Sequence, residues 1–422
     1  MLDIRYIREN ADEARRRLAT RGRGDENAIA QILALDEQRR DLLKQVETLK
    51  AERNKASKEV GMRKAKGEPA DDILAKMKTV SDDITTFDKK VAEVETAQSD
   101  LLLTIPNLPH ASVPVGADAA ANRMESTWGK PVQHDFKPLT HWEIGEKRGL
   151  LDFAQATKIS GSGFIVYRGA GARLERALIN YLLDLHTTEH GYLEVATPYV
   201  VHAASLQGTG QLPKFAEDLY SIKGEDLYLV PTAEVPVTNL HREEILAESA
   251  LPIAYAAYTP CFRREAGSAG KDTRGMIRVH QFDKVELVHI VKPEDSYAVL
   301  EKLRGHAERV LQDLGLHYRV LSLSTGDMGF GAAKCYDIEV WAPGLQTWLE
   351  VSSCSNFEDF QARRMNLRYK DAEGKNRFCH TLNGSGTALA RLYIALLETY
   401  QQSDGSVLLP GKLRPHFGSD RI

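Results

Sequence analysis

The stretch with the clearest chemical potential runs from Phe262 to Leu287. It opens with Phe262-Arg263-Arg264-Glu265, continues through a small, polar, glycine-rich loop at 266–275, and ends in a strand pattern over Met276–Leu287. Because successive strand residues point to opposite faces, one face of this strand carries Arg278, His280, Phe282, Lys284 and Glu286. That face offers a cation for a phosphate, a ring for a base and a carboxylate for an amine. A solvated face whose charges pair across strands would show the same pattern, so the strand alone leaves both interpretations open.

A second stretch of this kind is Leu382–Leu392, which reads LNGSGTALARL. Its glycines allow close backbone approach, and the leucines at 389, 392 and 396 predict a helix that follows. Arg391 falls in the early turns of this helix, where an acidic residue is the usual choice. Capping accounts for the glycines and for Ser385, but it leaves Arg391 unexplained.

The first quarter of the chain predicts a long helical hairpin. Apolar residues recur at spacings of three and four from Ile32 to Val60, and again from Ile73 to Leu101, on either side of a turn-like Gly67-Glu68-Pro69. A 3.5-residue period on both sides of one turn predicts an antiparallel coiled coil over about 28–102. We therefore expect an arm that stands apart from the globular part.

The charges of this arm are unevenly divided. Seven basic and two acidic residues lie between Lys50 and Lys66, whereas the second helix is acidic. Two interpretations stand side by side. The helices have ordinary solvated faces of opposite sign, or the basic edge meets a phosphate backbone.

The arm ends at three prolines, Pro106, Pro109 and Pro114, because proline cannot continue a helix. Beyond them, a helix over Leu174–Leu185 stops at His190-Gly191, and a short strand over Tyr192–Thr197 runs into Pro198. Strands and helices alternate irregularly, which favours an α+β fold with a mixed, mainly antiparallel sheet flanked by helices. We divide the chain into an arm at 1–105, a linker at 106–120 and an α+β domain at 121–422.

Composition narrows the class of protein. The 422 residues are 42% hydrophobic and 27% charged, with a formal net charge of -4, as in ordinary soluble globular proteins. No apolar run approaches the roughly 18 residues of a membrane helix, and the charged N-terminus is unlike a targeting peptide. The four cysteines lie far apart without a C-x-x-C pair. This spacing argues against a disulfide scaffold and against a cysteine-rich zinc site, and it fits a cytoplasmic protein.

Taken in order, the stretches around Pro198, Arg263 and Arg391 resemble the three signature motifs of class II aminoacyl-tRNA synthetases. The whole chain resembles the bacterial-type seryl-tRNA synthetase family. The resemblance extends over MLDIRYIREN, the arm, PTAEVPVTNLHREEIL, TPCFRREAGSAGKDTRGMIRVHQFDKVEL, TGDMGFGAAKCYDIEVWAPG, WLEVSSCSNFEDFQARR and LNGSGTALAR. One departure is Ala390, where the family usually has glycine, and a helix should tolerate the methyl group.

The resemblance implies a set of nucleotide-binding residues. Arg263 and Glu265 match the pair that grips the α-phosphate and the adenine amino group, and Arg391 matches the arginine near the γ-phosphate. These three are the implied catalytic residues. Further implied ATP-binding positions are Arg264, Val279, Phe282 (stacked on adenine), Glu350, Val351, Ser352 and Ser353. Glu350 and Ser353 are also implied to hold the Mg²⁺ that accompanies ATP, and no structural zinc is expected.

The same resemblance implies a serine pocket. Its members are Thr232, Ala233, Glu234, Arg263, Glu286, Asn383 and Ser385. Each position also has a plainer interpretation: Glu234 could be an N-terminal helix charge, and Ser353 a strand-end cap. The implied first reaction joins the serine carboxylate to the α-phosphorus of ATP. That carboxylate is already ionised at pH 7, so no general base is needed, and arginine suits both phosphate and carboxylate oxygens.

The family implies a homodimer whose substrates are L-serine, ATP and tRNA(Ser), and commonly tRNA(Sec), with no membrane partner. It also implies that the arm binds tRNA, for which Lys50, Arg53, Lys55 and Lys58 are the candidate contacts. Two alternatives remain. One is a paralogue that activates an amino acid to load a carrier protein or to make a metabolite, and such proteins typically lack the arm. The other is a non-catalytic RNA-binding homologue, against which the intact Arg263, Glu286 and Arg391 argue.

Overall fold

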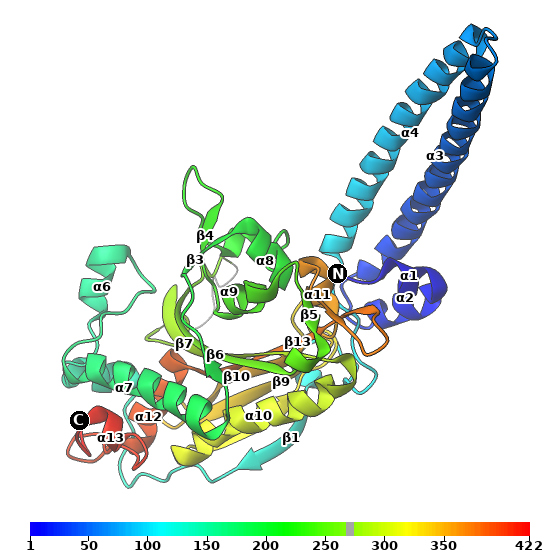
Figure 1. Ribbon diagram of the computed structural model, residues 1–422. Coiled ribbons are helices and arrows are strands. Elements are labelled where there is room, and N and C mark those ends of the chain that lie inside the picture. The colour runs from blue at the N-terminus through cyan, green and yellow to red at the C-terminus, as the bar shows by residue number, and fades with distance from the viewer. Residues whose placement is uncertain (267–273) are drawn as a thin grey trace. The chain divides into compact units, whose positions relative to one another are not determined.

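The computed structural model describes residues 1–266 and 274–422. The chain forms two compact units. The small unit comprises residues 2–19 and 23–106, and the large unit comprises residues 1, 20–22 and 107–422. Each unit is described separately below, with its elements labelled as in Figure 1.

The small unit is a helical hairpin preceded by short helices. Its elements are α1 (Ile4–Glu9), α2 (Ala11–Ala19), η1 (Asp25–Asn27), α3 (Ala28–Ala65) and α4 (Asp71–Thr104). The two long helices lie side by side in Figure 1 and are joined by five residues. The predicted antiparallel hairpin is confirmed, and α3 continues through Gly61 to Ala65.

The seam of the hairpin follows the predicted apolar pattern. Three cross-helix contacts set its antiparallel register: Arg39 with Glu95 at 2.8 Å, Lys50 with Asp88 at 3.3 Å, and Arg63 with Asp72 at 3.1 Å. Exposed ion pairs of this kind contribute only about 0–1 kcal/mol each, so burial of the seam holds the helices together. The buried seam residues are Val46, Val60, Ile73, Val80, Ile84, Val91 and Val94.

The large unit is built on a sheet that contains eight strands within the described residues, in the order β1-β8-β9-β10-β13-β7-β6-β2. The strands from β1 to β6 pair antiparallel, and β2 joins the edge in parallel. The predicted α+β class with a mixed, mainly antiparallel sheet is confirmed. The bounds are β1 (Arg123–Trp128), β8 (Tyr318–Ser322), β9 (Lys334–Ala342), β10 (Thr347–Asn356), β13 (His380–Ala388), β7 (Gln281–Val291), β6 (Ile253–Phe262) and β2 (Leu193–Glu194).

Two small sheets accompany the large one. One has the order β12 (Asn376–Phe378), β11 (Arg368–Lys370) and β5 (Ile245–Ala247), and the other pairs β3 (Val200–His202) with β4 (Leu227–Leu229). The helices are α5 (His141–Lys147), α6 (Phe153–Ser160), α7 (Ala170–Asp184), which runs into the π-helical turn η3 (Leu185–Glu189), α8 (Ala203–Thr209), α9 (Glu234–Thr238), α10 (Ser296–Asp313), α11 (Phe360–Met365), α12 (Leu389–Tyr400) and α13 (Arg414–Phe417).

The alternation of side chains along β7 separates the core of the large unit from its cavity. Val285, Leu287 and Val291 are buried in the main hydrophobic core, to which α7, α10 and α12 also contribute. Lys284 and Glu286 point to the opposite face and line a cavity. This is the period of two expected for a strand that is covered on both sides.

Two predicted strands are shorter in the structure than in the sequence pattern. The strand expected to begin at Met276 begins at Gln281, because backbone groups before it bond elsewhere. The Met276 N–H donates to the ring of His141 at 3.0 Å, and the His280 N–H donates to the carbonyl of Gly163 at 2.8 Å. The strand expected over Tyr192–Thr197 is a two-residue edge strand, β2, paired with β6 through Leu193 and Glu194. An edge strand has a partner on one side alone, and Pro198 has no N–H with which to extend the ladder.

None of the helices in the described parts of the chain combines the length and apolar character needed to cross a bilayer. The predicted boundaries at 105, 120 and 121 stay a prediction. The segment after Pro106 enters the large unit at once, where the Asn107 side chain donates to the carbonyl of Phe357 at 2.8 Å.

The hairpin seam generates a stability prediction. We expect Ile84→Ala to destabilise the hairpin by about 2 kcal/mol or more, because it removes buried methyl groups and leaves a cavity. Amide hydrogen exchange along α3 and α4 measures the effect. Thr85→Ala, at the exposed neighbouring position, is the matched control and should exchange like the parent. Equal exchange in both variants would contradict a stabilising role for the seam.

Candidate active site

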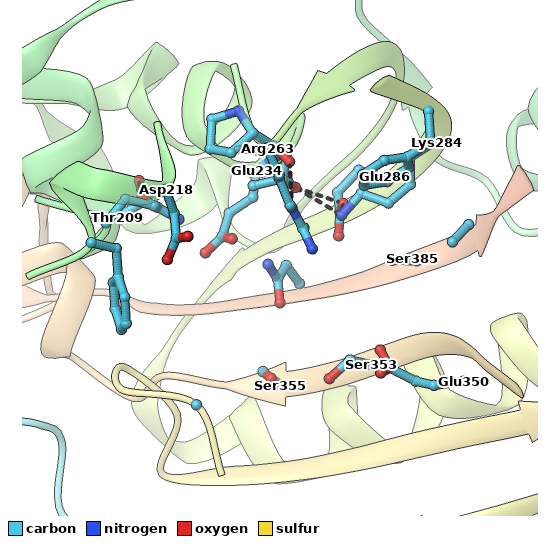
Figure 2. Close-up of a pocket in the computed structure, with 18 of the residues that line it drawn as sticks. Thr209, Asp218, Glu234, Arg263, Lys284, Glu286, Glu350, Ser353, Ser355 and Ser385 are labelled. Carbon is cyan, nitrogen blue, oxygen red and sulfur yellow. Dashed lines mark hydrogen bonds and ion pairs between the residues drawn. The ribbon is translucent and has the colours of Figure 1, made fainter. Parts of the chain in front are cut away.

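A cavity of about 730 Å³ lies in the large unit. Its walls come from β7, β10, β13, the first turn of α12 and a glycine-rich loop at 329–332, together with the segments at 231–234, 263–265 and 276–279. Figure 2 shows Glu350, Ser353 and Ser355 following one another along β10, with Ser385 on the neighbouring β13. The cavity brings together most of the residues assigned from sequence: Thr232, Glu234, Arg263, Glu265, Val279, Phe282, Glu286, Glu350, Val351, Ser353, Asn383, Ser385 and Arg391.

One end of the cavity holds a buried network of charged and polar groups. The Thr232 hydroxyl donates to Glu286 Oε2 at 2.9 Å and accepts from Lys284 Nζ at 2.8 Å. Lys284 and Glu286 also form an ion pair. All three side chains are buried. Buried charges are tolerated when they are paired and hydrogen-bonded, and this network meets that requirement.

Glu234 supplies a second carboxylate at this end. It is the first residue of α9, so the interpretation of Glu234 as an N-terminal helix charge describes its position correctly. Its side chain is buried and accepts from Gln361 Nε2. Burial, followed by repulsion from Glu286, raises the pKa of Glu234 from 4.5 to about 7. Near neutral pH this carboxyl group can therefore exist in either protonation state.

Arg263 lies between this polar end and an aromatic ring. Its Nε donates to the carbonyl of Pro231 at 3.2 Å, next to Thr232. Its guanidinium lies 5.2 Å from the centre of the Phe282 ring. Arginine stacked in this way keeps several N–H groups available for a planar or phosphate anion.

Glu265 closes the same side of the cavity. Its backbone is left-handed, with a φ of 52°, which is uncommon outside glycine. Its carboxylate forms an ion pair with Arg278. The predicted face of charged residues is thus partly confirmed, since Arg278, Phe282, Lys284 and Glu286 line the cavity. His280 instead packs against Phe164, outside the set of lining residues.

The opposite end of the cavity is formed by Arg391 and β10. Arg391, on the first turn of α12 as predicted, donates from Nε to the carbonyl of Ile277 at 3.2 Å. It also donates from Nη1 to the carbonyl of Glu350 at 2.8 Å, with the Glu350 carboxylate 3.4 Å away. The Ser353 hydroxyl lies 3.0 Å from Cys335 Sγ. Arg391 is therefore fixed by backbone carbonyls on two separate segments.

Glycine and polar residues alternate along β13 for a steric reason. Asn383 and Ser385 line the cavity, and Ser385 lies directly opposite Glu286 in the strand register. A Cβ at Gly384 would lie 2.9 Å from Cys354 Sγ, and one at Gly386 would lie 2.7 Å from His186 Nε2. Close backbone approach, expected for these glycines, is confirmed.

Comparison with known proteins shows which family this chain resembles along its length. A serine–tRNA ligase of Akkermansia muciniphila is 59% identical over 424 residues, covering 100% of this chain and 99% of that protein. Residues 1–109 match the seryl-tRNA synthetase N-terminal domain, and residues 218–400 match the tRNA synthetase class II core domain (G, H, P, S and T).

The chain belongs to the seryl-tRNA synthetase family.

Solved seryl-tRNA synthetases agree with this assignment. The crystal structure of seryl-tRNA synthetase from Pyrococcus horikoshii complexed with ATP is 40% identical, with a TM-score of 0.94, covering 100% of this chain and 99% of that one. The cytoplasmic serine–tRNA ligase from Naegleria fowleri in complex with AMP is 32% identical, with a TM-score of 0.89, covering 100% and 98%. The predicted family resemblance is confirmed.

Three side chains assigned from the seryl-tRNA synthetase resemblance lie outside the set that lines the cavity. Arg264 is exposed, and its backbone N–H donates to the carbonyl of Asp218 at 2.9 Å. Ala233 is packed in a small apolar cluster with Val237. Ser352 donates to the carbonyl of Ser385 at 2.7 Å and so joins β10 to β13.

Lys284, which lines the cavity, and Gln361, which contacts Glu234, are two of the polar side chains that were not assigned to the seryl-tRNA synthetase pocket from sequence. Lys284 lies two residues before Glu286 on the same strand face, and this spacing was the available signal. Gln361 lies 127 positions from Glu234 in sequence. It links Glu234 to Thr381, whose hydroxyl donates to Gln361 Oε1 at 2.6 Å. No local pattern distinguishes Gln361 from any other glutamine on a short helix.

The raised pKa of Glu234 generates a pH prediction. Its folded-state pKa, about 7, lies above the ordinary value of 4.5. The folded protein therefore binds more protons between these values, and the parent loses stability as pH rises through this window. Glu234→Gln keeps an acceptor oxygen for Gln361 but does not titrate. We expect its stability relative to the parent to increase by about 1–3 kcal/mol between pH 5 and pH 8.

Urea unfolding of both proteins at the two pH values measures this difference. Groups other than Glu234 titrate in both proteins, so they cancel in the comparison. A difference in unfolding free energy that does not change with pH would contradict the raised pKa.

Proposed function

We propose that this chain is an ATP-dependent serine–tRNA ligase that forms seryl-adenylate and transfers the seryl group to the 3′ end of tRNA(Ser). The observation that carries the proposal is the place of Arg263 in a single cavity, between the carboxylates of Glu234 and Glu286 and the ring of Phe282. The family and the full-length similarity to serine–tRNA ligases support the same activity. Serine-dependent ATP–pyrophosphate exchange, followed by charging of tRNA, tests it.

The polar end of the cavity suits the amino-acid substrate. We assign the serine ammonium and hydroxyl groups to Thr232, Glu234, Glu286, Asn383 and Ser385, which all line the cavity. Lys284 balances the charge of Glu286, so the two carboxylates do not repel each other unopposed. A site built to hydrogen-bond a hydroxyl rejects analogues that lack it by up to about 10⁴–10⁵-fold. Alanine and glycine are excluded on this basis.

The other end suits ATP. We assign Phe282 to stacking on adenine, with Val279 and Val351 beside it, and Glu265 to the adenine amino group. Arg263 aligns the serine carboxylate with the α-phosphate, and Arg391 meets the γ-phosphate. Arginine stabilises the charge that develops as the carboxylate oxygen bonds to phosphorus and pyrophosphate leaves. We assign no side-chain contact with ATP to Arg264 or Ser352, and none with serine to Ala233.

The donors on β10 fit a magnesium ion that accompanies ATP. Glu350 and Ser353 both line the cavity and offer a carboxylate and a hydroxyl oxygen, which are the hard donors that Mg²⁺ prefers alongside phosphate oxygens and water. When bound, Mg²⁺ would supply charge neutralisation on the phosphates. Arg391 stays within reach of the same carboxylate through its contact with Glu350.

We assign tRNA binding to the helical hairpin. Lys55 and Lys58 are exposed on α3, and Arg53 lies beside them. Lys50 is engaged with Asp88, which makes it a weaker candidate for a phosphate contact. Basic side chains that neutralise phosphates supply most of the non-specific affinity for nucleic acids. The match of residues 1–109 to the seryl-tRNA synthetase N-terminal domain supports this assignment.

We further propose a cytoplasmic homodimer that accepts tRNA(Sec) where the host makes it. The exposed Leu193 on edge strand β2 supports a partner at this edge, because paired or covered edges avoid aggregation. Light scattering of the purified protein tests the dimer, and charging of a selenocysteine tRNA transcript tests the second substrate. The four buried free thiols suit a reducing compartment.

The assignment of Arg263 generates the first functional prediction. Arg263→Ala should lower ATP–pyrophosphate exchange by at least about 10²-fold, because removing one preorganised donor at the reacting centre costs this much. The melting temperature should stay close to that of the parent. Arg264→Ala, at the adjacent exposed position, should lower the rate of ATP–pyrophosphate exchange less than about tenfold. Equal losses in the two variants would contradict the roles assigned here.

The assignment of tRNA binding to the hairpin generates the second functional prediction. Removing residues 44–91 and joining the ends with a short flexible linker leaves Asp36 with its partners Arg8 and Arg40. Serine activation should survive, since the cavity lies wholly in the large unit. Charging of tRNA should fall steeply.

A charge-reversal pair gives a sharper test in the full-length chain. Lys55→Glu with Lys58→Glu should weaken tRNA charging, and the effect should diminish at high salt because screening weakens the parent's own contacts. Lys76→Glu with Lys78→Glu, on the exposed face of α4, is the matched control. If both pairs charge tRNA like the parent, α3 does not carry the phosphate contacts.

A further inference from the structure

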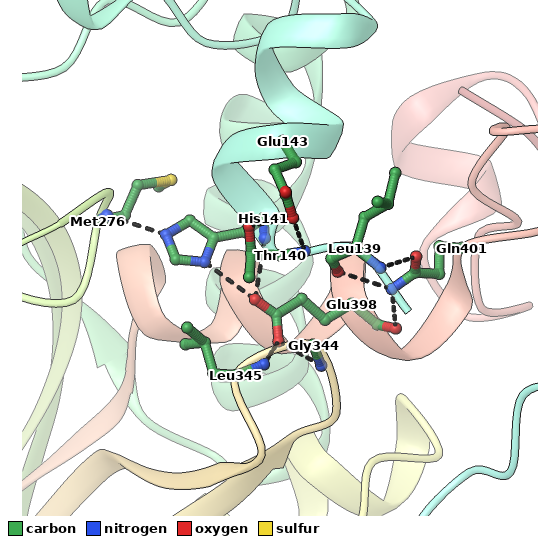
Figure 3. Close-up of polar contacts among 9 residues, drawn as sticks. All are labelled: Leu139, Thr140, His141, Glu143, Met276, Gly344, Leu345, Glu398 and Gln401. Atoms are coloured by element: carbon green, nitrogen blue, oxygen red, sulfur yellow. Dashed lines mark hydrogen bonds and ion pairs between the residues drawn. The ribbon is translucent and has the colours of Figure 1, made fainter. Parts of the chain in front are cut away.

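A buried histidine–glutamate pair lies behind the cavity. His141 is the first residue of α5, and Glu398 lies on α12, seven positions after Arg391. Both side chains are fully buried, and His141 Nδ1 lies 3.0 Å from Glu398 Oε1. Figure 3 shows the imidazole ring between the Glu398 carboxylate and the backbone of Met276. Neither residue lines the cavity, so the chemistry proposed above does not explain them.

Glu398 joins three segments of the large unit. It accepts backbone hydrogen bonds from His141 at 2.9 Å, Gly344 at 2.9 Å and Leu345 at 3.0 Å. The last two residues form the turn between β9 and β10. The carboxylate therefore holds the start of α5 and the turn that precedes Glu350 against α12.

The contacts of the His141 ring determine where its proton lies. His141 Nε2 accepts from the Met276 backbone N–H at 3.0 Å, so this nitrogen must carry a lone pair. The single ring proton then sits on Nδ1, where it is donated to Glu398. A carboxylate that fixes the tautomer of a histidine in this way also fixes the orientation of the ring.

The chain around Met276 is shaped to meet α5. Gly275 has a left-handed backbone with a φ of 72°, and a Cβ there would lie 2.2 Å from His141 Nε2. The Arg274 guanidinium lies 4.7 Å from the ring centre of Trp142, the next residue of α5. The segment 274–276 thus contacts α5 through a cation–π pair, a close glycine approach and a hydrogen bond.

The residues that follow Met276 reach the nucleotide end of the cavity. The carbonyl of Ile277 accepts from Arg391 Nε at 3.2 Å, and Val279 lines the cavity. His141 therefore holds one end of a short segment whose next carbonyl orients Arg391. Nothing in this chain of contacts includes the Thr232, Lys284 and Glu286 network.

We propose that His141, oriented by Glu398, is a positioning residue for ATP: it fixes segment 274–279 so that the Ile277 carbonyl aims Arg391 at the phosphates. This inference rests on the proposed function, because it takes the cavity to bind ATP. The inference predicts that disturbing His141 raises the KM for ATP without a matching rise in the KM for serine. A general loss of packing would not produce this difference.

Two substitutions separate the two ring nitrogens. His141→Asn places an amide near the Nδ1 position, so it can still donate to Glu398, but it offers no acceptor to Met276. His141→Gln places an amide oxygen near the Nε2 position and can still accept from Met276. We expect H141N to raise the KM for ATP in pyrophosphate exchange at least tenfold, with the KM for serine changed less than twofold. H141Q should show a clearly smaller rise for ATP.

Tyr400→Phe is the matched control, because Tyr400 lies on α12, the helix that carries Glu398. It removes one hydrogen bond, from the Tyr400 hydroxyl to the Leu314 carbonyl at 2.6 Å, without touching segment 274–279. It should lower the melting temperature and leave both KM values unchanged. Should H141N fail to fold, Trp142→Leu, which removes the partner of Arg274, should raise the KM for ATP selectively.

Calorimetric titration with ATP separates this inference from the proposed function, because it needs no turnover. Weaker ATP binding by H141N than by the parent supports the inference even if serine exchange is absent. Equal ATP affinity in the parent, H141N and W142L overturns it. Parallel changes in the KM values for ATP and serine would also overturn the inference. A rise in the KM for ATP as large in H141Q as in H141N would overturn it as well.

Discussion

The alternation of side chains along β7 and β13 is the constraint on which the rest of the large unit depends. Both faces of these strands are covered, so one face must be apolar and the other must hold its polar groups in mutual contact. On β7, Val285 and Leu287 enter the core, while Lys284 and Glu286 enter the cavity. On β13, glycine at 384 and 386 allows α10 and η3 to pack closely, and Ser385 lies opposite Glu286 in the strand register. The register of one strand pair thus sets both the packing of the core and the geometry of the proposed serine pocket.

Burying the charges of this pocket costs free energy, and the contacts among the charged groups offset that cost. Removing a carboxylate and an ammonium from water carries a desolvation penalty that attraction offsets only when the geometry is good. Lys284, Thr232 and Glu286 have that geometry. Glu234 has a neutral amide as its partner, and its pKa rises to about 7. An amino acid brings a positive group for these carboxylates and a negative group for Arg263. The pocket is therefore electrostatically complementary to a zwitterion, which a purely structural charge cluster would not need to be.

The contacts of Arg263 and Arg391 favour a catalytic protein over the two alternatives left open by the sequence. A paralogue that loads a carrier protein would be expected to lack the arm, yet α3 and α4 form a complete hairpin, and the relatives match along the whole chain. A scaffold kept only for RNA binding would have no reason to hold Arg391 on two separate carbonyls beside Glu350. Preorganised cations of this kind are the means by which charge is stabilised in phosphoryl and adenylyl transfer.

The sequence by itself determined the hairpin and the α+β class, and most of the site residues implied by its resemblance to the seryl-tRNA synthetases line the cavity. A heptad pattern fixes which helix faces meet, and strand alternation fixes which residues of β7 share a face, because both are local periodicities. The tertiary structure decided where β7 begins. The N–H of Met276 meets His141, which is 135 positions away in sequence, and so does not continue the strand. It also decided that Gln361 contacts Glu234, and that Ala233, Arg264 and Ser352 point elsewhere. These outcomes depend on which distant segment packs against a given group in the folded chain. Hydrogen bonds between segments far apart in sequence produce no periodic pattern from which they could be predicted.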